Sequence, residues 1–98
     1  MVVVHLVLLS FGDAPAPAIE ALMSALRSLR DSVPGVLELS CGANFTSRGR
    51  EFTHALMVKL VDKAALDAYA VHPEHVRVVT ELLAPIRKDV LAIDFEAA

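Results

Sequence analysis

The sequence is poor in the residues that mark several classes of protein. Its 98 residues include one cysteine, Cys41, and no tryptophan. A lone cysteine excludes an internal disulfide and suits a reducing compartment. Basic residues are also few, since 9 Lys and Arg stand against 12 Asp and Glu and leave a net charge of -3. No basic face is evident, which argues against nucleic acid as a partner.

Long apolar runs are absent as well. No run approaches the ~18 residues that a helix needs to cross a bilayer, so we expect no membrane partner. The apolar stretch 2–9 is short, contains His5 and has no basic lead-in, which argues against a secretory signal peptide. We therefore expect a cytoplasmic protein, and the length fits a single domain over residues 1–98.

The chain is instead rich in apolar residues. Hydrophobic residues make up 55% of the sequence, whereas a typical domain has ~45–50%. A chain this short has a large surface relative to its core, so it cannot bury all of these side chains alone. The excess indicates a partner subunit, and a second copy of the same chain is the simplest partner.

Periodicity predicts four strands and two helical regions. β-branched and aliphatic runs predict strands at 2–11, 36–43, 52–61 and 90–95. Apolar residues three and four apart predict an amphipathic helix over 16–32. Asp62 is placed to cap a short helix over 63–70, and Pro73 is placed to begin a further helical segment.

The same patterns predict which side chains are buried. In the strand 36–43, alternation groups Leu37, Leu39 and Cys41 on one face. Cys41 is then a small buried residue rather than a reactive thiol. In the helical segment after Pro73, the spacing places Val76 and Val79 on the buried side.

This order of elements, β-α-β-β-α-β, is the ferredoxin-like pattern of an α+β protein. It predicts a four-stranded antiparallel sheet with both helical regions on one face. The strands 2–11 and 52–61 are largely apolar on both faces, so something also covers the second face of the sheet. Two such sheets packed face to face about a two-fold axis form a dimeric α+β barrel, and we expect a homodimer of this kind.

Chemically active side chains are concentrated in residues 69–75, Tyr-Ala-Val-His-Pro-Glu-His. This stretch contains the only tyrosine, Tyr69, and two of the four histidines, His72 and His75. Phenol and imidazole both donate and accept hydrogen bonds, and imidazole titrates near neutral pH. Pro73 interrupts the helix, because a residue before proline is biased out of the helical region.

Two strands supply further candidates for a pocket. Alternation groups His5 with Val7 and Leu9 on the first strand, and His54 with Leu56 on the third. If these faces meet the helices, they enclose an apolar cavity with a few polar groups, which is typical of a small-molecule site. A histidine base beside a tyrosine donor could remove a proton next to a carbonyl group and stabilise the enolate.

Structural roles stay open for each of these residues. His5 and His54 could be buried histidines bonded to the backbone, Tyr69 could be a core residue, and His72 could be a loop or capping residue. A transition-metal site is not predicted, because Pro73 interrupts the helical face between the last two histidines and no compact third ligand is evident. We expect neither a metal nor another cofactor.

Several short motifs follow one another along the chain: Val-His-Leu-Val-Leu at 4–8, Val-Pro-Gly-Val at 33–36, Gly-Ala-Asn-Phe at 42–45, Phe-Thr-His-Ala-Leu at 52–56, Ala-Tyr-Ala-Val-His-Pro-Glu-His at 68–75 and Ile-Asp-Phe at 93–95. In this order and at this spacing they resemble the stress-responsive dimeric α/β-barrel (A/B barrel) domains, over essentially the whole chain. The resemblance implies a homodimer with a pocket between the sheet and the helices of each subunit.

One plant branch of that family is a polyketide cyclase that closes a ring by intramolecular aldol condensation without a cofactor. The resemblance implies that its base corresponds to His75, its tyrosine to Tyr69 and its first-strand histidine to His5. A second pocket tyrosine of the cyclase falls at Leu26, which favours binding or a different reaction over cyclisation. We expect six further ligand contacts: Val7, Leu9, Leu26, His54, Leu56 and His72.

Three functions are therefore open. The protein could be a cofactor-independent, cyclase- or isomerase-like enzyme that transforms a small hydrophobic or carbonyl compound. It could be a stress-protective module that binds a hydrophobic ligand without chemistry. It could also be a structural dimer whose pocket is filled by core side chains. A cavity bordered by the two histidines and the tyrosine would distinguish the first function from the third.

Overall fold

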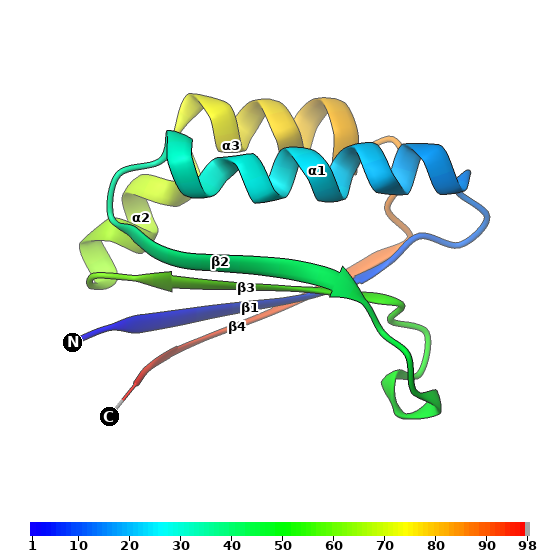
Figure 1. Cartoon of the computed structure of the whole chain (residues 1–98), viewed down its shortest axis with the longest axis horizontal. Helices are drawn as coiled ribbons and strands as arrows, with labels where there is room; N and C mark the ends of the chain where they lie inside the picture. Colours follow the sequence, from blue (N-terminus) through cyan, green and yellow to red (C-terminus); the bar gives the residue numbers. More distant parts are fainter. Residues whose placement is uncertain (98) are drawn as a thin grey trace.

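The computed structural model describes residues 1–97, which form one antiparallel sheet with a layer of helices on one side (Figure 1). The strands are β1 (Val3–Ser10), β2 (Val36–Ala43), β3 (His54–Leu60) and β4 (Asp89–Glu96). Their spatial order is β2-β3-β1-β4, so β1 and β3 are central and β2 and β4 are the edges. The predicted ferredoxin-like α+β fold is confirmed.

The long helix α1 (Ala16–Ser32) has the bounds that its periodicity predicts. It begins between two prolines, Pro15 and Pro17, which are tolerated there because the first backbone N–H groups of a helix have no partner within it. Its buried stripe packs against the sheet and consists of Leu22, Met23, Leu26 and Leu29. A short 3-10 turn, η1 (Ser47–Gly49), lies in the loop between β2 and β3.

The second helical region is interrupted just before Pro73, as the sequence predicts. The carboxylate of Asp62 caps α2 (Lys63–Val71) by accepting a hydrogen bond from the Ala65 N–H at 2.8 Å. His72 is extended, and α3 (Pro73–Val78) begins at the next residue. The His72 Nδ1 accepts a hydrogen bond from the Glu74 N–H at 3.1 Å. His72 is therefore the N-cap of α3.

A π-helical turn, η2 (Val79–Leu83), follows α3. The Ala84 N–H donates to the Val79 carbonyl, five residues back, at 2.8 Å. Such a turn contains one residue more than an α-helical turn and shifts the buried face by one position. The buried residues Val78 and Leu83 are accordingly five positions apart, and extrapolating α-helical spacing back from Leu83 selects the wrong residue. The prediction that Val76 is buried is therefore wrong, since Val76 is 47% exposed and Val78 is 1% exposed.

A second one-residue irregularity lies at the start of β2. The pairing register of β2 with β3 shifts between Val36 and Glu38, which is a β-bulge that turns the strand locally. Leu37 therefore faces solvent instead of sharing a buried face with Leu39, and that prediction is also wrong. Cys41 is half-buried, and its Sγ lies 3.6 Å from the Met23 carbonyl oxygen. Burial raises the pKa of the Cys41 thiol.

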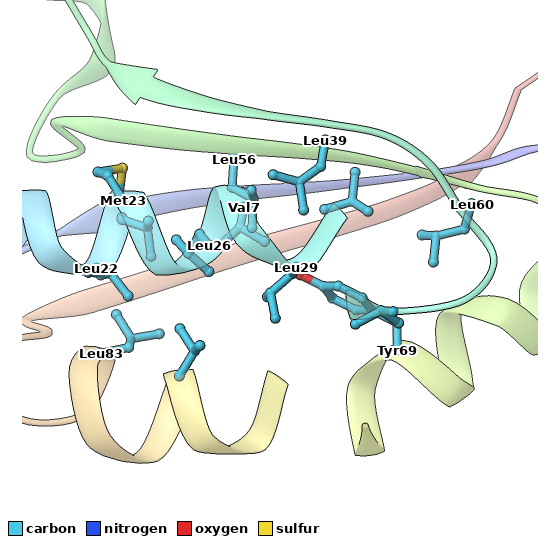
Figure 2. Packing of buried hydrophobic residues seen from close by; sticks show 14 of the residues in the cluster. Val7, Leu22, Met23, Leu26, Leu29, Leu39, Leu56, Leu60, Tyr69 and Leu83 are labelled. Carbon is cyan, nitrogen blue, oxygen red and sulfur yellow. The ribbon is translucent and has the colours of Figure 1, made fainter. Parts of the chain in front are cut away.

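The core lies between the helices and one face of the sheet, and Figure 2 shows its side chains meeting there from both layers. The opposite face of the sheet carries no helix (Figure 1). Leu91, Ile93 and Phe95 of β4 lie on this open face and are about half exposed. Within residues 1–97, no helix combines the length and the apolar character that a membrane span requires.

Candidate functional site

A cavity of about 230 Å³ lies between the sheet and the helices. Its walls come from β1, β3, β4, α1 and the segment 73–88. Six of the residues that the sequence predicts for the site line it: His5, Val7, Leu9, Leu26, Leu56 and His75. A larger hollow of about 480 Å³ lies outside, between α1 and β2, and contains none of the histidines. Another hollow, of about 440 Å³, contains only His54 of the predicted site residues. The inner cavity therefore brings together most of the residues that the sequence predicts for the site.

His75 reaches this cavity from the first turns of α3. Its Nδ1 lies 3.0 Å from the Ala70 carbonyl oxygen. A carbonyl can only accept, so Nδ1 carries the hydrogen and Nε2 of the neutral ring keeps its lone pair. Burial lowers the pKa of His75, against the opposing effect of the Ala70 hydrogen bond. The ring is therefore neutral at pH 7 and can act as a base.

Tyr69 packs between α2 and the sheet and is 1% exposed. Its ring centroid lies 4.5 Å from that of His75 and 5.9 Å from that of His5. The hydroxyl is buried and has no hydrogen-bond partner within residues 1–97. Burial raises the pKa of Tyr69 to about 12, so the phenol stays protonated at neutral pH. Tyr69 borders both imidazoles without lining the cavity itself.

His5 is positioned by the pairing of the first and last strands. The β1–β4 register places His5 opposite Asp94, and the His5 Nδ1 is hydrogen-bonded to the Asp94 carboxylate. A carboxylate accepts, so the Nδ1 of His5 donates and its Nε2 is left for a ligand. A carboxylate in this position fixes the tautomer and the orientation of the imidazole.

The other two histidines lie outside the cavity. The His54 ring packs edge-on against Phe11 at a centroid distance of 5.2 Å, and its Nδ1 is hydrogen-bonded to the Thr53 hydroxyl at 2.9 Å. Burial lowers the pKa of His54. His72 is occupied as a helix cap. His72 thus has the capping role that the sequence left open. His54 also has a structural contact, but with the side chain of Thr53 and not with the backbone.

The sequence reasoning missed Asp94 and five cavity-lining residues. Val90, Ala92 and Asp94 are alternate residues of β4 and therefore point to the same face of the sheet. Strand alternation could thus have indicated all three. A single carboxylate inside an apolar strand was a second signal for Asp94. Helical spacing indicated that Val79 and Leu83 are buried but not that they face a cavity, and Arg87 had no signal in the sequence.

The histidines and the carboxylate near the cavity do not form a metal site. Within residues 1–97, no three His, Cys, Asp or Glu side chains are grouped closely enough to hold an ion. What the cavity offers is the imidazoles of His5 and His75, each with Nδ1 engaged by the described residues of the protein and Nε2 not, set in an aliphatic wall. A protonated phenol packs against both rings. This arrangement is suited to moving protons on a small, mostly apolar molecule.

The chain thus combines a ferredoxin-like sheet that has one open face with a cavity lined by two histidines. Residues 3–97 match the family model of the Stress responsive A/B Barrel Domain. The chain belongs to this family, and the resemblance seen in its motifs is confirmed.

Three comparisons illustrate the relationship. The chain is 37% identical, over 101 residues, to the Arabidopsis thaliana stress-response A/B barrel domain-containing protein DABB1, covering 98% of this chain and 47% of that protein. It thus spans less than half the length of that relative. A dimeric ferredoxin-like protein of unknown function from Jannaschia sp. CCS1 shares 34% identity at a TM-score of 0.83, covering 99% of this chain and 100% of the other.

A hydroxynitrile lyase from Passiflora edulis has a TM-score of 0.89 and 17% identity, and the alignment covers 99% of this chain and 94% of that chain. At this identity the comparison shows a shared fold alone.

Proposed function

We propose that this protein is a cofactor-independent acid–base enzyme that acts on a small apolar carbonyl compound bound in the inner cavity. The observation that carries the proposal is the buried hydroxyl of Tyr69, which has no hydrogen-bond partner within residues 1–97 and belongs to a ring that packs beside His75. Buried polar groups without partners are rare, and they concentrate where a role in function compensates for their cost. The neutral imidazole beside it presents a free nitrogen to the cavity.

The proposed step is proton abstraction next to a carbonyl group. The C–H bond breaks, its electron pair moves into the enolate, and the proton goes to Nε2 of His75. The phenol of Tyr69, which burial keeps protonated, is the proposed donor for the developing enolate oxygen. Because Tyr69 packs beside His75 without lining the cavity, this donation requires the phenol to approach the substrate when it binds. Hydrogen bonds of this kind are often long in a free enzyme and tighten when substrate is bound.

His5 is the second acid–base group in this proposal. Its bond to Asp94 orients the ring and stabilises the imidazolium that forms when Nε2 takes a proton. Two bases on opposite walls allow one to remove a proton and the other, once protonated, to return one elsewhere on the substrate. An isomerisation or an intramolecular condensation requires this pair of steps, and neither requires a cofactor.

Binding without chemistry is a second candidate, and the aliphatic wall favours it. Leu26 is 4% exposed and lines the cavity, at the position where the cyclase resemblance implies a tyrosine. Without that phenol, the part of the wall that Leu26 forms offers shape and apolar contact but no further donor. A stress-protective carrier of a hydrophobic molecule needs no more than this.

We also propose that the protein is a homodimer that pairs through the open face of the sheet. Leu91, Ile93 and Phe95 leave apolar surface there, and solved structural relatives of the same fold are described as dimeric. Burial of such a face against a second copy is the usual solution for a sheet that carries helices on one side only.

The test compares turnover and binding in matched variants. Purified protein is incubated with a panel of small 1,3-dicarbonyl compounds in deuterated water, and exchange of the acidic C–H is followed by NMR. We expect His75→Gln to lose catalysed exchange, while His54→Gln, which changes a histidine outside the cavity, keeps it. Equal exchange by the parent and His75→Gln would remove His75 from the role of base.

The same panel separates the two candidate functions. If the parent protein binds a compound, as seen by shifts in its own NMR spectrum, and accelerates no exchange above the solvent rate, the carrier function is favoured. If Tyr69→Phe lowers the exchange rate with an unchanged dissociation constant, the phenol acts in the transition state and the enzyme function is supported.

A further inference from the structure

We propose that Arg87 is an anion-binding residue at the mouth of the inner cavity and that the natural ligand carries a carboxylate at the end remote from His75. The inference deepens the proposed function, because it uses the same cavity and names the chemical class of its ligand. It assigns one end of the molecule to the histidines and the other end to a guanidinium group.

Arg87 combines two properties that seldom occur together. It is exposed to solvent, and it lines a cavity whose other walls are mainly aliphatic. Among the residues that line this cavity it is the only Lys, Arg, Asp or Glu. A charged side chain at the border of an apolar cavity fixes how a ligand enters, because the ligand's charged end stays where water is available.

The guanidinium of Arg87 is also available to a ligand, as far as the described residues 1–97 are concerned. None of the ion pairs within residues 1–97 includes it. By contrast, Arg77 of α3 is held between two carboxylates, at 3.3 Å from Glu74 and 3.4 Å from Glu81. An arginine with five unassigned donors presents the planar fork that a carboxylate accepts in bidentate fashion.

The turn that carries Arg87 is fixed at the end of the cavity opposite the histidines. The Arg87 N–H donates to the Leu83 carbonyl at 2.9 Å, and the Lys88 N–H donates to the Ser10 carbonyl at 2.7 Å. These bonds place the turn beside the end of β1. Figure 2 shows Tyr69 and Leu83 at opposite ends of the core, with Val7 and Leu26 between them.

The length and volume of the inner cavity restrict the size of the ligand. His5 and Leu9 both line the cavity and are four residues apart on β1, which corresponds to about 13 Å at ~3.3 Å per residue. The volume of about 230 Å³ exceeds the ~150 Å³ that accommodates benzene in an apolar cavity. A short-chain or medium-chain oxo acid, with its carboxylate at Arg87 and its ketone near His75, fits both limits.

Binding of octanoate and octanol, measured by NMR titration, tests the assignment without any turnover. The two probes share one apolar chain and differ in the charged group. We expect the parent protein to bind octanoate more tightly than octanol. Arg87→Gln should lower the affinity for octanoate by about tenfold or more and leave the affinity for octanol unchanged. Arg87→Lys keeps the charge without the fork and should retain part of the preference.

Lys88→Gln is the matched control, since it removes the same charge one residue away and Lys88 does not line the cavity. The inference is overturned if Lys88→Gln lowers the affinity for octanoate as much as Arg87→Gln does. It is also overturned if Arg87→Gln binds octanoate as tightly as the parent, or if the parent does not bind octanoate. His75→Gln should keep the preference for octanoate. An octanoate preference that depends on Arg87, together with unchanged exchange in His75→Gln, would therefore refute the proposed catalysis and leave this inference standing.

Discussion

Replacing Tyr69 by phenylalanine removes one buried oxygen and leaves the aromatic ring in place. The hydroxyl has no partner within residues 1–97 and the residue is 1% exposed. A buried hydroxyl left without a hydrogen bond costs about 1–3 kcal/mol. We therefore expect Tyr69→Phe to increase the free energy of unfolding by about 1 kcal/mol, even though it removes a group that we place in the catalytic apparatus.

The assay is thermal unfolding followed by circular dichroism, with urea unfolding as a second measure. For a domain of this size, 1 kcal/mol corresponds to a rise in Tm of about 4–8 °C. Tyr69→Ala is the control, because it removes the ring that packs in the core and should lower stability by about 3–5 kcal/mol. A loss of 1 kcal/mol or more in Tyr69→Phe would refute the reasoning, since it would mean that the hydroxyl has a stabilising partner in the folded protein.

Four further predictions follow from the same structure. Tyr69 is the only tyrosine and there is no tryptophan, so phenolate absorbance reports this residue alone and should titrate near pH 12 in the folded protein, against about 10 in denaturant; a midpoint near 10 while the protein is still folded would contradict the burial of the hydroxyl. Burial lowers the pKa of His75, so the unfolded chain binds more protons as the pH falls below ~6.5 and stability is lost there; urea unfolding at several pH values should show a weaker loss in His75→Gln. Ile93→Lys places a charge on the open face of the sheet and should convert a dimer into a monomer in sedimentation at micromolar concentration, whereas a parent that already sediments as a monomer would refute the pairing. Leu29→Ala empties a site that is 1% exposed and should lower the free energy of unfolding by about 2–5 kcal/mol in urea, a smaller loss indicating that α1 closes the gap.

The fold was predictable because its signals are local and repeated. Strand alternation and helical spacing each extend over many residues, so a single exception does not change the assignment of an element. The bounds of α1 follow from such a pattern, as does the break before Pro73, where a single proline dictates the backbone of its neighbour. The two wrong burial assignments, at Leu37 and Val76, come from a bulge and a π turn. Each inserts one residue into an otherwise regular element, and periodicity carries no sign of it.

The site was predictable only in part, because it depends on contacts between distant segments. The sequence places His5, Tyr69 and His75 on faces that can meet, and the structure brings their rings together. Asp94 was missed because its contact depends on which residue of β4 lies opposite which residue of β1. That register is set by sheet packing. Arg87 lies in an irregular turn, where neither alternation nor helical spacing indicates a direction for the side chain.

The bond between His5 and Asp94 joins residues that are 89 positions apart in the chain. Contacts of such long range form late, because closing a long loop costs more conformational entropy than closing a short one. The hairpin of β2 and β3 and the packing of α1 are more local and can form first. We therefore expect a partly folded chain, whether newly synthesised or recovering from heat, to contain the helices and a cavity wall before it has an oriented His5. Under our proposal, catalytic competence is acquired only when β4 has docked, so regain of activity during refolding would report the last step of folding.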